Sequence, residues 1–270
     1  MNNIQTKYGP KALITGGSSG IGKAIALELA KNGIVPILVA RNEEKLRQAS
    51  EEIFKKHKMQ TLTYSLDLSD DSEVKALINR VKSEDIGLFV HSAGIENKGF
   101  FNKIPKEDEL KLIQLNIVST YLLTHHFSEK MVANKRGGIL LISSLFGLMP
   151  SPYFSNYAAS KSYVHNLGLS LHTELKELGV DVSVLAPGLT DTDMTSESHE
   201  IDWERLPMKR MDASKVAEIA VSNLGKKATI IPGAMNKMMG AMAKRVFSMK
   251  AFSKMNGKMI GNAIAPNKLY

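Results

Sequence analysis

The chain of 270 residues contains no cysteine, which excludes disulfides, thiolate nucleophiles and sulfur-ligated metals. It also lacks a signal peptide and any apolar run of about 20 residues, the length that a membrane-spanning helix needs. We therefore expect a cytoplasmic protein, with peripheral contact at a membrane surface as the alternative.

Patterns for metal binding and for hydrolysis are missing as well. His125 and His126 are neighbours, so on a helix their side chains point about 100° apart. His165 and His172 have no carboxylate at ligand spacing. No nucleophile elbow surrounds Ser144. We expect neither a metal site nor serine-hydrolase chemistry.

Acidic residues are absent from Lys226 to Tyr270, a stretch with nine basic residues. Residues 1–225 carry the other 26 basic residues and all 27 acidic ones, so this C-terminal stretch accounts for the net charge of +8. The nearly neutral body, and a tail without interleaved aromatic residues, argue against nucleic-acid binding.

Apolar runs alternate with helical patterns through most of the chain. They predict strands at 11–15, 36–40, 61–66, 87–91, 138–143, 180–185 and 228–231. Helices are predicted near 21–32, 43–57, 70–83, 106–134, 154–178 and 212–224. Pro36 is placed first in its strand, because a proline inside a central strand removes a hydrogen bond. The pattern predicts an α/β fold: one doubly wound Rossmann-type domain over 1–234 with a seven-stranded parallel sheet, then a helical tail at 235–270.

A glycine-rich loop, Thr15-Gly16-Gly17-Ser18-Ser19-Gly20-Ile21-Gly22, joins the first predicted strand to the first predicted helix. Glycines let the backbone approach a pyrophosphate, and the free N–H groups at the helix start favour its charge. The loop predicts a dinucleotide site, with an ordinary glycine turn as the alternative. The expected contacts are Gly16, Ser18, Ser19, Gly20, Ile21 and Gly22.

In such sheets, ligands bind beyond the carboxyl ends of the strands. Arg41 follows the second strand, where an NAD-binding protein usually carries an acid. A guanidinium there pairs with the 2′-phosphate of NADP, so we expect NADP (NADPH) to be preferred over NAD. The alternative is a solvated surface arginine.

Two further strand ends carry candidate residues. After the third strand, Asp67, beside Leu68, is placed either to accept a hydrogen bond from adenine or to cap the next helix. After the fourth strand, Ala93 and Gly94 are small enough for the backbone to pass close to a cofactor. His91 is expected to be a core histidine satisfied by backbone groups.

Tyr157 and Lys161 are four residues apart in a predicted helix and therefore share one face. A nearby ammonium stabilises a phenolate and lowers the tyrosine pKa from its usual value of about 10, which tunes the phenol as a proton donor. Taken alone, this spacing is more often structural than functional.

These features occur together and in order, and in that combination the chain resembles the short-chain dehydrogenase/reductase family over about residues 11–232. The residues that carry the resemblance are Thr15 to Gly22, Asp67, Ala93-Gly94, Asn116, Ile142-Ser143-Ser144, Tyr157 with Lys161, and Pro187-Gly188.

The resemblance implies a division of roles. Tyr157 would exchange a proton with the substrate oxygen while hydride moves between carbon and nicotinamide. Ser144 would orient that oxygen, with Ser143 as the structural alternative. Lys161 would bind the nicotinamide ribose and lower the tyrosine pKa, and Asn116 would hold a water that resupplies the proton.

After the sixth strand, the resemblance implies nicotinamide contacts from Pro187, Gly188, Thr190 and Thr192, with a plain turn and helix cap as the alternative. The chain departs from the family pattern at two places. His91-Ser92 replaces the usual Asn-Asn, and the glycine loop lacks the basic residue that many NADP-using members carry.

The polar segment 192–211, with the only tryptophan at Trp203, lies where the family places a mobile lid over the substrate. Beyond the last strand, the spacing predicts an amphipathic helix whose apolar stripe is Met235, Met238, Met242, Val246, Met249 and Phe252. This basic, methionine-rich helix fits four roles: docking on its own domain, packing on a second subunit, covering an apolar substrate, or lying on an anionic membrane.

The sequence thus predicts an NADP(H)-dependent oxidoreductase that interconverts a ketone and a secondary alcohol on an apolar or lipid-like substrate. The resemblance implies a homo-oligomer, commonly a dimer or tetramer. The alternative function is a cofactor-binding regulatory or scaffold protein held at a membrane or partner by its tail. The complete set of Asn116, Ser144, Tyr157 and Lys161 favours the enzyme.

Overall fold

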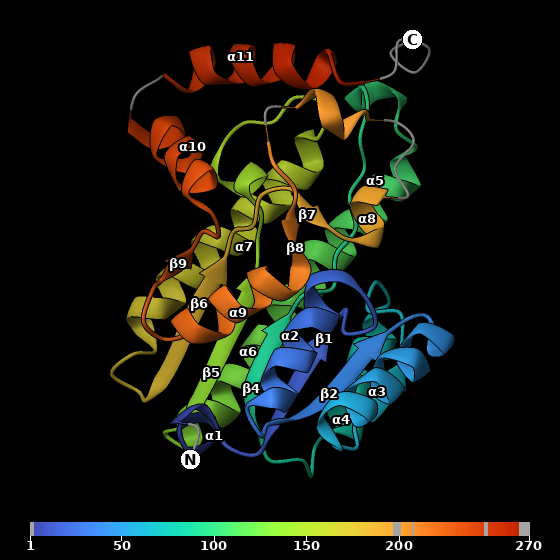
Figure 1. The fold of residues 1–270 in the computed structure, drawn as a ribbon, viewed down its shortest axis with the longest axis vertical. Helices are drawn as coiled ribbons and strands as arrows, with labels where there is room; N and C mark the ends of the chain where they lie inside the picture. Colours follow the sequence, from blue (N-terminus) through green and yellow to red (C-terminus); the bar gives the residue numbers. More distant parts are fainter. Residues whose placement is uncertain (1–2, 197–200, 207, 246–247, 265–270) are drawn as a thin grey trace.

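A seven-stranded parallel sheet forms the centre of the molecule, with helices on both faces (Figure 1). The computed structural model describes residues 3–196, 201–206, 208–245 and 248–264. The strand order is β3-β2-β1-β4-β5-β6-β9. The strands are β1 (Lys11–Thr15), β2 (Val35–Ala40), β3 (Leu62–Ser65), β4 (Ile86–His91), β5 (Gly137–Ile142), β6 (Val180–Leu185) and β9 (Thr229–Ile230). The predicted Rossmann-type fold and its seven parallel strands are confirmed.

The helices form two layers because each has one apolar stripe. In α3, for example, Leu46, Ala49 and Ile53 recur at helical spacing and are buried. One layer consists of α2 (Gly20–Lys31), α3 (Glu43–His57) and α9 (Ala213–Asn223). The other consists of α4 (Asp71–Arg80), α6 (Ser119–Ala133) and α7 (Ser155–Glu174). A short helix, α1 (Asn3–Tyr8), precedes β1.

The strands are apolar on both faces because both faces are covered. In β1, Leu13 packs into one core, while Ala12 and Ile14 pack into the other. Pro36 is the second residue of β2 and not the first. Val35 donates its N–H to Pro10 O, on the side of β2 that faces β1. The backbone nitrogen of the next residue, Pro36, therefore faces β3, and pairing with β3 begins only at Ile37. No hydrogen bond is lost there.

The predicted helix at 106–134 is interrupted in its middle. It consists of α5 (Lys106–Ile113), a π-helical turn (Gln114–Val118) and α6. Asn116 lies in the π turn and is buried. Turns of this kind are rare and often occur at functional sites, and the apolar pattern of the sequence does not reveal them.

The segment after β6 contains a second, two-stranded sheet, β7 (Thr190–Asp191) with β8 (Met211–Asp212), and the short helix α8 (Asp193–Ser196). The tail forms two helices, α10 (Ala234–Arg245) and α11 (Met249–Gly261), where the spacing predicts one. The second begins where Ser248 caps it by accepting a hydrogen bond from Ala251 N at 3.2 Å. Val246 lies outside the described residues.

α11 lies across the end of the molecule farthest from the N-terminus (Figure 1). Within the described ranges, no helix combines the length and the apolar character that crossing a bilayer requires.

Candidate active site

The glycine-rich loop lies where the strand order reverses, between β1 and β4. Gly16 has φ +64°, and a Cβ on it would lie 2.9 Å from Ala93 N. A Cβ on Gly22 would lie 2.2 Å from Gly16 O. Only glycine fits at both positions, so the loop folds tightly against the end of β4.

The start of α2 fits the phosphates of a dinucleotide. Ser19 is its N-cap residue, but its side chain makes no capping hydrogen bond, so the first-turn N–H groups are not capped by the chain itself. Thr15 fixes the neighbouring backbone, because its hydroxyl accepts hydrogen bonds from Ser92 N and Ala93 N, both at 3.1 Å. The loop therefore has both the space and the donors that a pyrophosphate needs.

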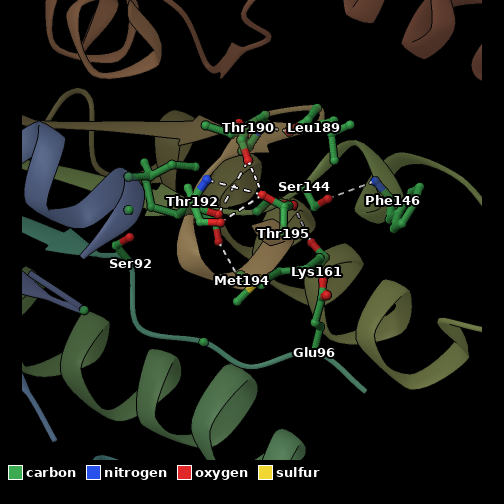
Figure 2. A pocket seen from close by; sticks show the side chains of 18 of the residues that line it. Ser92, Glu96, Ser144, Phe146, Lys161, Leu189, Thr190, Thr192, Met194 and Thr195 are labelled. Carbon is green, nitrogen blue, oxygen red and sulfur yellow. Dashed lines mark hydrogen bonds between the residues drawn. The ribbon is translucent and has the colours of Figure 1, made fainter. Parts of the chain in front are cut away.

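A cavity opens beyond the carboxyl ends of β1, β4, β5 and β6 (Figure 2). Most of the residues predicted from the sequence line it: Gly16, Ser19, Gly20, Ile21, Gly22, Ala93, Gly94, Ser144, Tyr157, Lys161, Pro187, Gly188, Thr190 and Thr192. Segments that are distant in sequence thus meet at one edge of the sheet, as the strand-end argument predicts.

Four predicted cofactor residues lie outside this cavity lining: Ser18, Arg41, Asp67 and Leu68. Arg41 is half exposed, and its Nη1 lies 3.9 Å from Asp67 Oδ2. Leu68 is a core residue. The helix-cap alternative for Asp67 is wrong, because Asp70 caps α4 through Ser72 N at 2.7 Å.

Lys161 is buried beside the tyrosine. Its Nζ donates a hydrogen bond to Ile142 O at 3.0 Å and lies 5.8 Å from the centroid of the Tyr157 ring. A Cβ on Gly94 would lie 3.1 Å from this ammonium, so glycine there leaves room for it. Burial lowers the pKa of Lys161 to about 8, against the opposing effect of the Glu96 charge.

The sequence predicts that Lys161 lowers the pKa of Tyr157, but in the structure this pKa is raised. Burial raises the pKa of Tyr157 above its ordinary value, the negative charge of Glu96 adds to the rise, and a hydrogen bond with Ser144 opposes it. The phenol is therefore protonated at neutral pH, which is the form that donates a proton.

The two serines at the end of β5 have different partners. Ser143 is 2% exposed, and its hydroxyl donates to Lys161 O at 2.7 Å, which ties β5 to α7. Ser144 instead hydrogen-bonds with Tyr157. The geometry therefore favours Ser144 over Ser143 as the residue beside a reacting oxygen.

Asn116 lies behind the cavity, not in its lining. Its Oδ1 accepts from Ile95 N at 3.0 Å, and its Nδ2 donates to Ile95 O at 2.9 Å and to Ser160 Oγ at 3.1 Å. The side chain thus joins the loop after β4 to α7. Its predicted role as a water-holding residue stays a prediction.

His91 is a core histidine, as expected, but its partners differ from the expected backbone groups. Its two ring nitrogens lie 3.3 Å from Ser119 Oγ and Thr120 Oγ1. Burial, together with the charge of Lys161, lowers the pKa of His91 to about 3. His91 is therefore uncharged at neutral pH.

Three threonines form a network at one wall of the cavity (Figure 2). The hydroxyl of Thr195 donates to Thr190 O at 2.8 Å and accepts from Thr192 N at 3.2 Å. Sequence reasoning missed Thr195, because the family segment that it matched ends at Thr192.

Glu96 is the other missed residue. It lines the cavity beside Lys161 (Figure 2), and its Oε1 lies 3.0 Å from Lys98 Nζ. Both side chains are nearly buried, at 10% and 12% exposure. A charged residue in a loop is normally solvated, so the sequence carries no signal of this placement.

α11 contacts two segments near the cavity. Asn256 donates to Pro150 O at 2.9 Å, just ahead of α7. At its end, Ala263 O accepts from Asp202 N at 2.8 Å, and Ile264 pairs with Ile201. One helix therefore holds both the segment that leads into the catalytic helix and residues 201–206, the described part of the predicted lid.

The comparisons with known proteins agree with this geometry. The sequence matches the family model described as short chain dehydrogenase over residues 10–202. The chain belongs to this family. It is therefore an oxidoreductase of the class that acts on CH–OH groups with a nicotinamide cofactor, and the glycine cradle described above fits that cofactor.

Two curated relatives of this short-chain dehydrogenase are similar over most of its length. The very-long-chain 3-oxoacyl-CoA reductase of Mus musculus is 30% identical over 243 residues, which cover 88% of this chain and 76% of the relative. The inactive hydroxysteroid dehydrogenase-like protein 1 of Homo sapiens is 32% identical over 225 residues, which cover 81% and 67%.

Two solved structures share the fold of this short-chain dehydrogenase. A structure reported for a 7β-hydroxysteroid dehydrogenase has a TM-score of 0.86 at 26% identity and covers 95% of this chain and 100% of that one. A short-chain dehydrogenase from Sphingobium yanoikuyae in complex with NADPH has a TM-score of 0.78 at 26% identity, with 88% and 96% covered.

Proposed function

We propose that the protein is an NADP(H)-dependent reductase of apolar or lipid-like ketones, or the reverse alcohol dehydrogenase, with Tyr157 as the proton donor. The observation that carries the proposal is the meeting of Tyr157, Ser144 and Lys161 in the cavity that the glycine loop borders. When bound, the nicotinamide supplies or accepts the hydride.

The residues supply the proton and its electrostatics. Tyr157 gives its phenolic proton to the carbonyl oxygen, and its raised pKa keeps this proton on the phenol at neutral pH until the oxygen becomes basic. Ser144 hydrogen-bonds the same oxygen and orients it. The Lys161 ammonium, with a pKa of about 8, is largely protonated at neutral pH and stabilises the phenolate that remains. Gly16 and Gly22 let the loop fold tightly beside β4, and Gly94 leaves room for the Lys161 ammonium, so the backbone that would meet the cofactor is held close to the strand ends.

An apolar substrate fits the remaining lining, which includes Leu145, Phe146, Leu189, Met194 and Met208. Apolar side chains favour the burial of apolar ligand surface, and they offer few hydrogen bonds to a small polar substrate. The names of two relatives point the same way, since one reduces very-long-chain 3-oxoacyl-CoA and one acts on hydroxysteroids.

The decisive test of this function is NADPH oxidation against a panel of ketones graded from small to lipid-like. Selective turnover of long or fused-ring ketones supports the proposal. A relative named as inactive favours the regulatory alternative. NADPH binding without turnover of any ketone therefore contradicts the proposed enzymatic function and supports a regulatory one.

The preference for NADP(H) rests on Arg41, which is half exposed at the end of β2. Arg41→Ala is expected to raise the Kd of NADPH about tenfold, because one charge-assisted pair with the 2′-phosphate is lost, and to leave the Kd of NADH nearly unchanged. Titration of purified protein with each cofactor measures both constants.

A matched control is Arg47→Ala, on neighbouring α3. Arg47 is exposed and pairs with Glu44 and Glu51, so its loss removes a charge without touching the nucleotide. Equal weakening of NADPH and NADH in Arg41→Ala, or an equal effect of Arg47→Ala, contradicts the assignment.

We further propose that the tail rests on an anionic membrane surface. Lys250, Lys254 and Lys258 recur every fourth residue on the exposed side of α11, opposite the buried side that carries Phe252 and Ile260. No acidic residue follows Lys226, so no charge of the tail opposes this face.

Exposed apolar side chains accompany the lysines. Met235, Met238, Met249 and Met255 are between 47% and 57% exposed. Basic groups that meet anionic headgroups, together with apolar groups that enter the interface, are the two components of peripheral membrane binding. Such a site gives the enzyme access to lipid-like substrates.

Replacing Lys250, Lys254 and Lys258 by glutamine is expected to weaken binding to vesicles of phosphatidylcholine with phosphatidylserine about 100-fold, at ~1 kcal/mol for each lysine. Cosedimentation measures the binding, with vesicles of phosphatidylcholine alone as the reference.

The control for vesicle binding is glutamine at Lys55, Lys75 and Lys82, which are exposed on the body and change the net charge equally. No binding of the unmodified protein to anionic vesicles, or equal loss in both triple variants, contradicts the membrane proposal.

A further inference from the structure

Trp203 carries a buried hydrogen-bond donor that no residue in the described part of the chain accepts. It is the only tryptophan of the sequence, it lines the cavity, and it is 6% exposed. Among the described residues, none accepts a hydrogen bond from its Nε1. A buried indole N–H normally has a partner, because burying it unpaired costs free energy. Because Trp203 lines the cavity, an oxygen of a bound ligand can accept this hydrogen bond.

Two charged side chains lie near this indole, in addition to its apolar neighbours. The ammonium of Lys98 lies 5.9 Å from the centroid of the Trp203 ring and 3.0 Å from Glu96 Oε1. Glu96 lines the same cavity. Burying an ion pair costs desolvation free energy. A cavity that bound only hydrocarbon would need no such pair in its lining. The loop after β4 and the lid thus bring three polar side chains together.

Phe154 contacts both Tyr157 and Trp203. Its ring centroid lies 6.3 Å from that of Tyr157 and 6.3 Å from that of Trp203. Tyr157 and Trp203 both line the cavity, so a substrate that hydrogen-bonds with both side chains carries two oxygens.

We propose that Trp203, Glu96 and Lys98 form a subsite for a second, uncharged oxygen of the ketone substrate, with Trp203 Nε1 as the hydrogen-bond donor. The inference rests on the proposed ketone reduction and names a feature of its substrate. A hydroxyl or second carbonyl fits the site. A carboxylate does not, because Lys98 is already paired and Glu96 repels a second anion.

Two probe ketones that differ only in the second oxygen test the subsite. Decalone has one carbonyl on a fused two-ring frame, and decalindione has a second carbonyl on the other ring. The unmodified protein is expected to prefer decalindione, measured as the ratio of the two kcat/KM values. Trp203→Phe keeps an apolar ring without the N–H and is expected to lower this ratio about tenfold.

The matched control is Leu206→Ala. Leu206 belongs to the same buried cluster as Trp203, so its truncation loosens the lid without removing a donor. It is expected to leave the ratio unchanged. An unchanged ratio in Trp203→Phe, or an equal fall in both variants, overturns the subsite.

A second measurement needs no variant and no turnover. Because Trp203 is the only tryptophan, fluorescence excited where tyrosine does not absorb reports on this site alone. In the presence of NADP⁺, decalindione is expected to shift the emission to longer wavelength by hydrogen-bonding the indole, and decalone is not. Equal responses to both ketones overturn the subsite. A selective shift without any turnover supports the subsite and contradicts the reductase, so the two failures are distinguishable.

Discussion

Tyr157→Phe is expected to lower kcat by about 10³-fold while the Kd of NADPH stays within a factor of two, because general acid catalysis contributes about 10²–10⁴. The substitution removes one hydroxyl from the cavity and leaves the ring, which packs against Phe154, in place. Steady-state kinetics with the best ketone of the panel, together with a cofactor titration, measure the two effects.

The control for this experiment is Tyr163→Phe. Tyr163 lies on the same helix, α7, but packs against the core and does not line the cavity. Tyr163→Phe removes the same hydroxyl and is expected to leave kcat unchanged. Turnover that persists in Tyr157→Phe, or a fall of the same size in Tyr163→Phe, contradicts the role of Tyr157.

Gly22→Ala is expected to have the largest effect on cofactor binding. The new Cβ meets Gly16 O at 2.2 Å, and a backbone oxygen cannot move aside as a flexible side chain does. We expect the Kd of NADPH to rise about 100-fold, equal to ~3 kcal/mol, and the free energy of unfolding to fall by about 3 kcal/mol. Cofactor titration and urea denaturation measure these changes.

Gly240→Ala provides the same substitution without the clash. Gly240 also lies inside a helix, α10, where a Cβ would meet Ile231 and Leu148 at 3.4 and 3.5 Å, which is ordinary contact. Unchanged NADPH affinity in Gly22→Ala means that the loop does not bind the pyrophosphate as described. A comparable loss of affinity in Gly240→Ala shows that the effect is not specific to the loop.

The features predicted well from the sequence are local ones. The strand ends, the glycine loop and the spacing of Tyr157 and Lys161 depend on neighbouring residues and on the rule that parallel strands end at one edge. The structure places these residues around one cavity. The short helix α1 was not predicted, although its Tyr8 is buried and donates a hydrogen bond to Asp181 at 2.8 Å. Six residues show too little periodicity for a pattern to emerge.

The features that the sequence did not reveal depend on tertiary packing. The raised pKa of Tyr157 results from burial, which the spacing of a tyrosine and a lysine does not contain. The inward position of Glu96, and that of Trp203, whose Nε1 has no acceptor among the described residues, depend on how the loop after β4 and residues 201–206 pack over the sheet. α11 begins as a separate helix because Ser248 caps it, although the apolar stripe in the sequence looks continuous at this point.

α11 links two parts of the molecule that are distant in sequence. Its side chain Asn256 donates a hydrogen bond to Pro150 O, just ahead of α7, and Ala263 and Ile264, just after the helix, contact Asp202 and Ile201. Displacing the helix would break both sets of contacts at once. We therefore expect α11 and residues 201–206 to open together as one cooperative unit in hydrogen exchange.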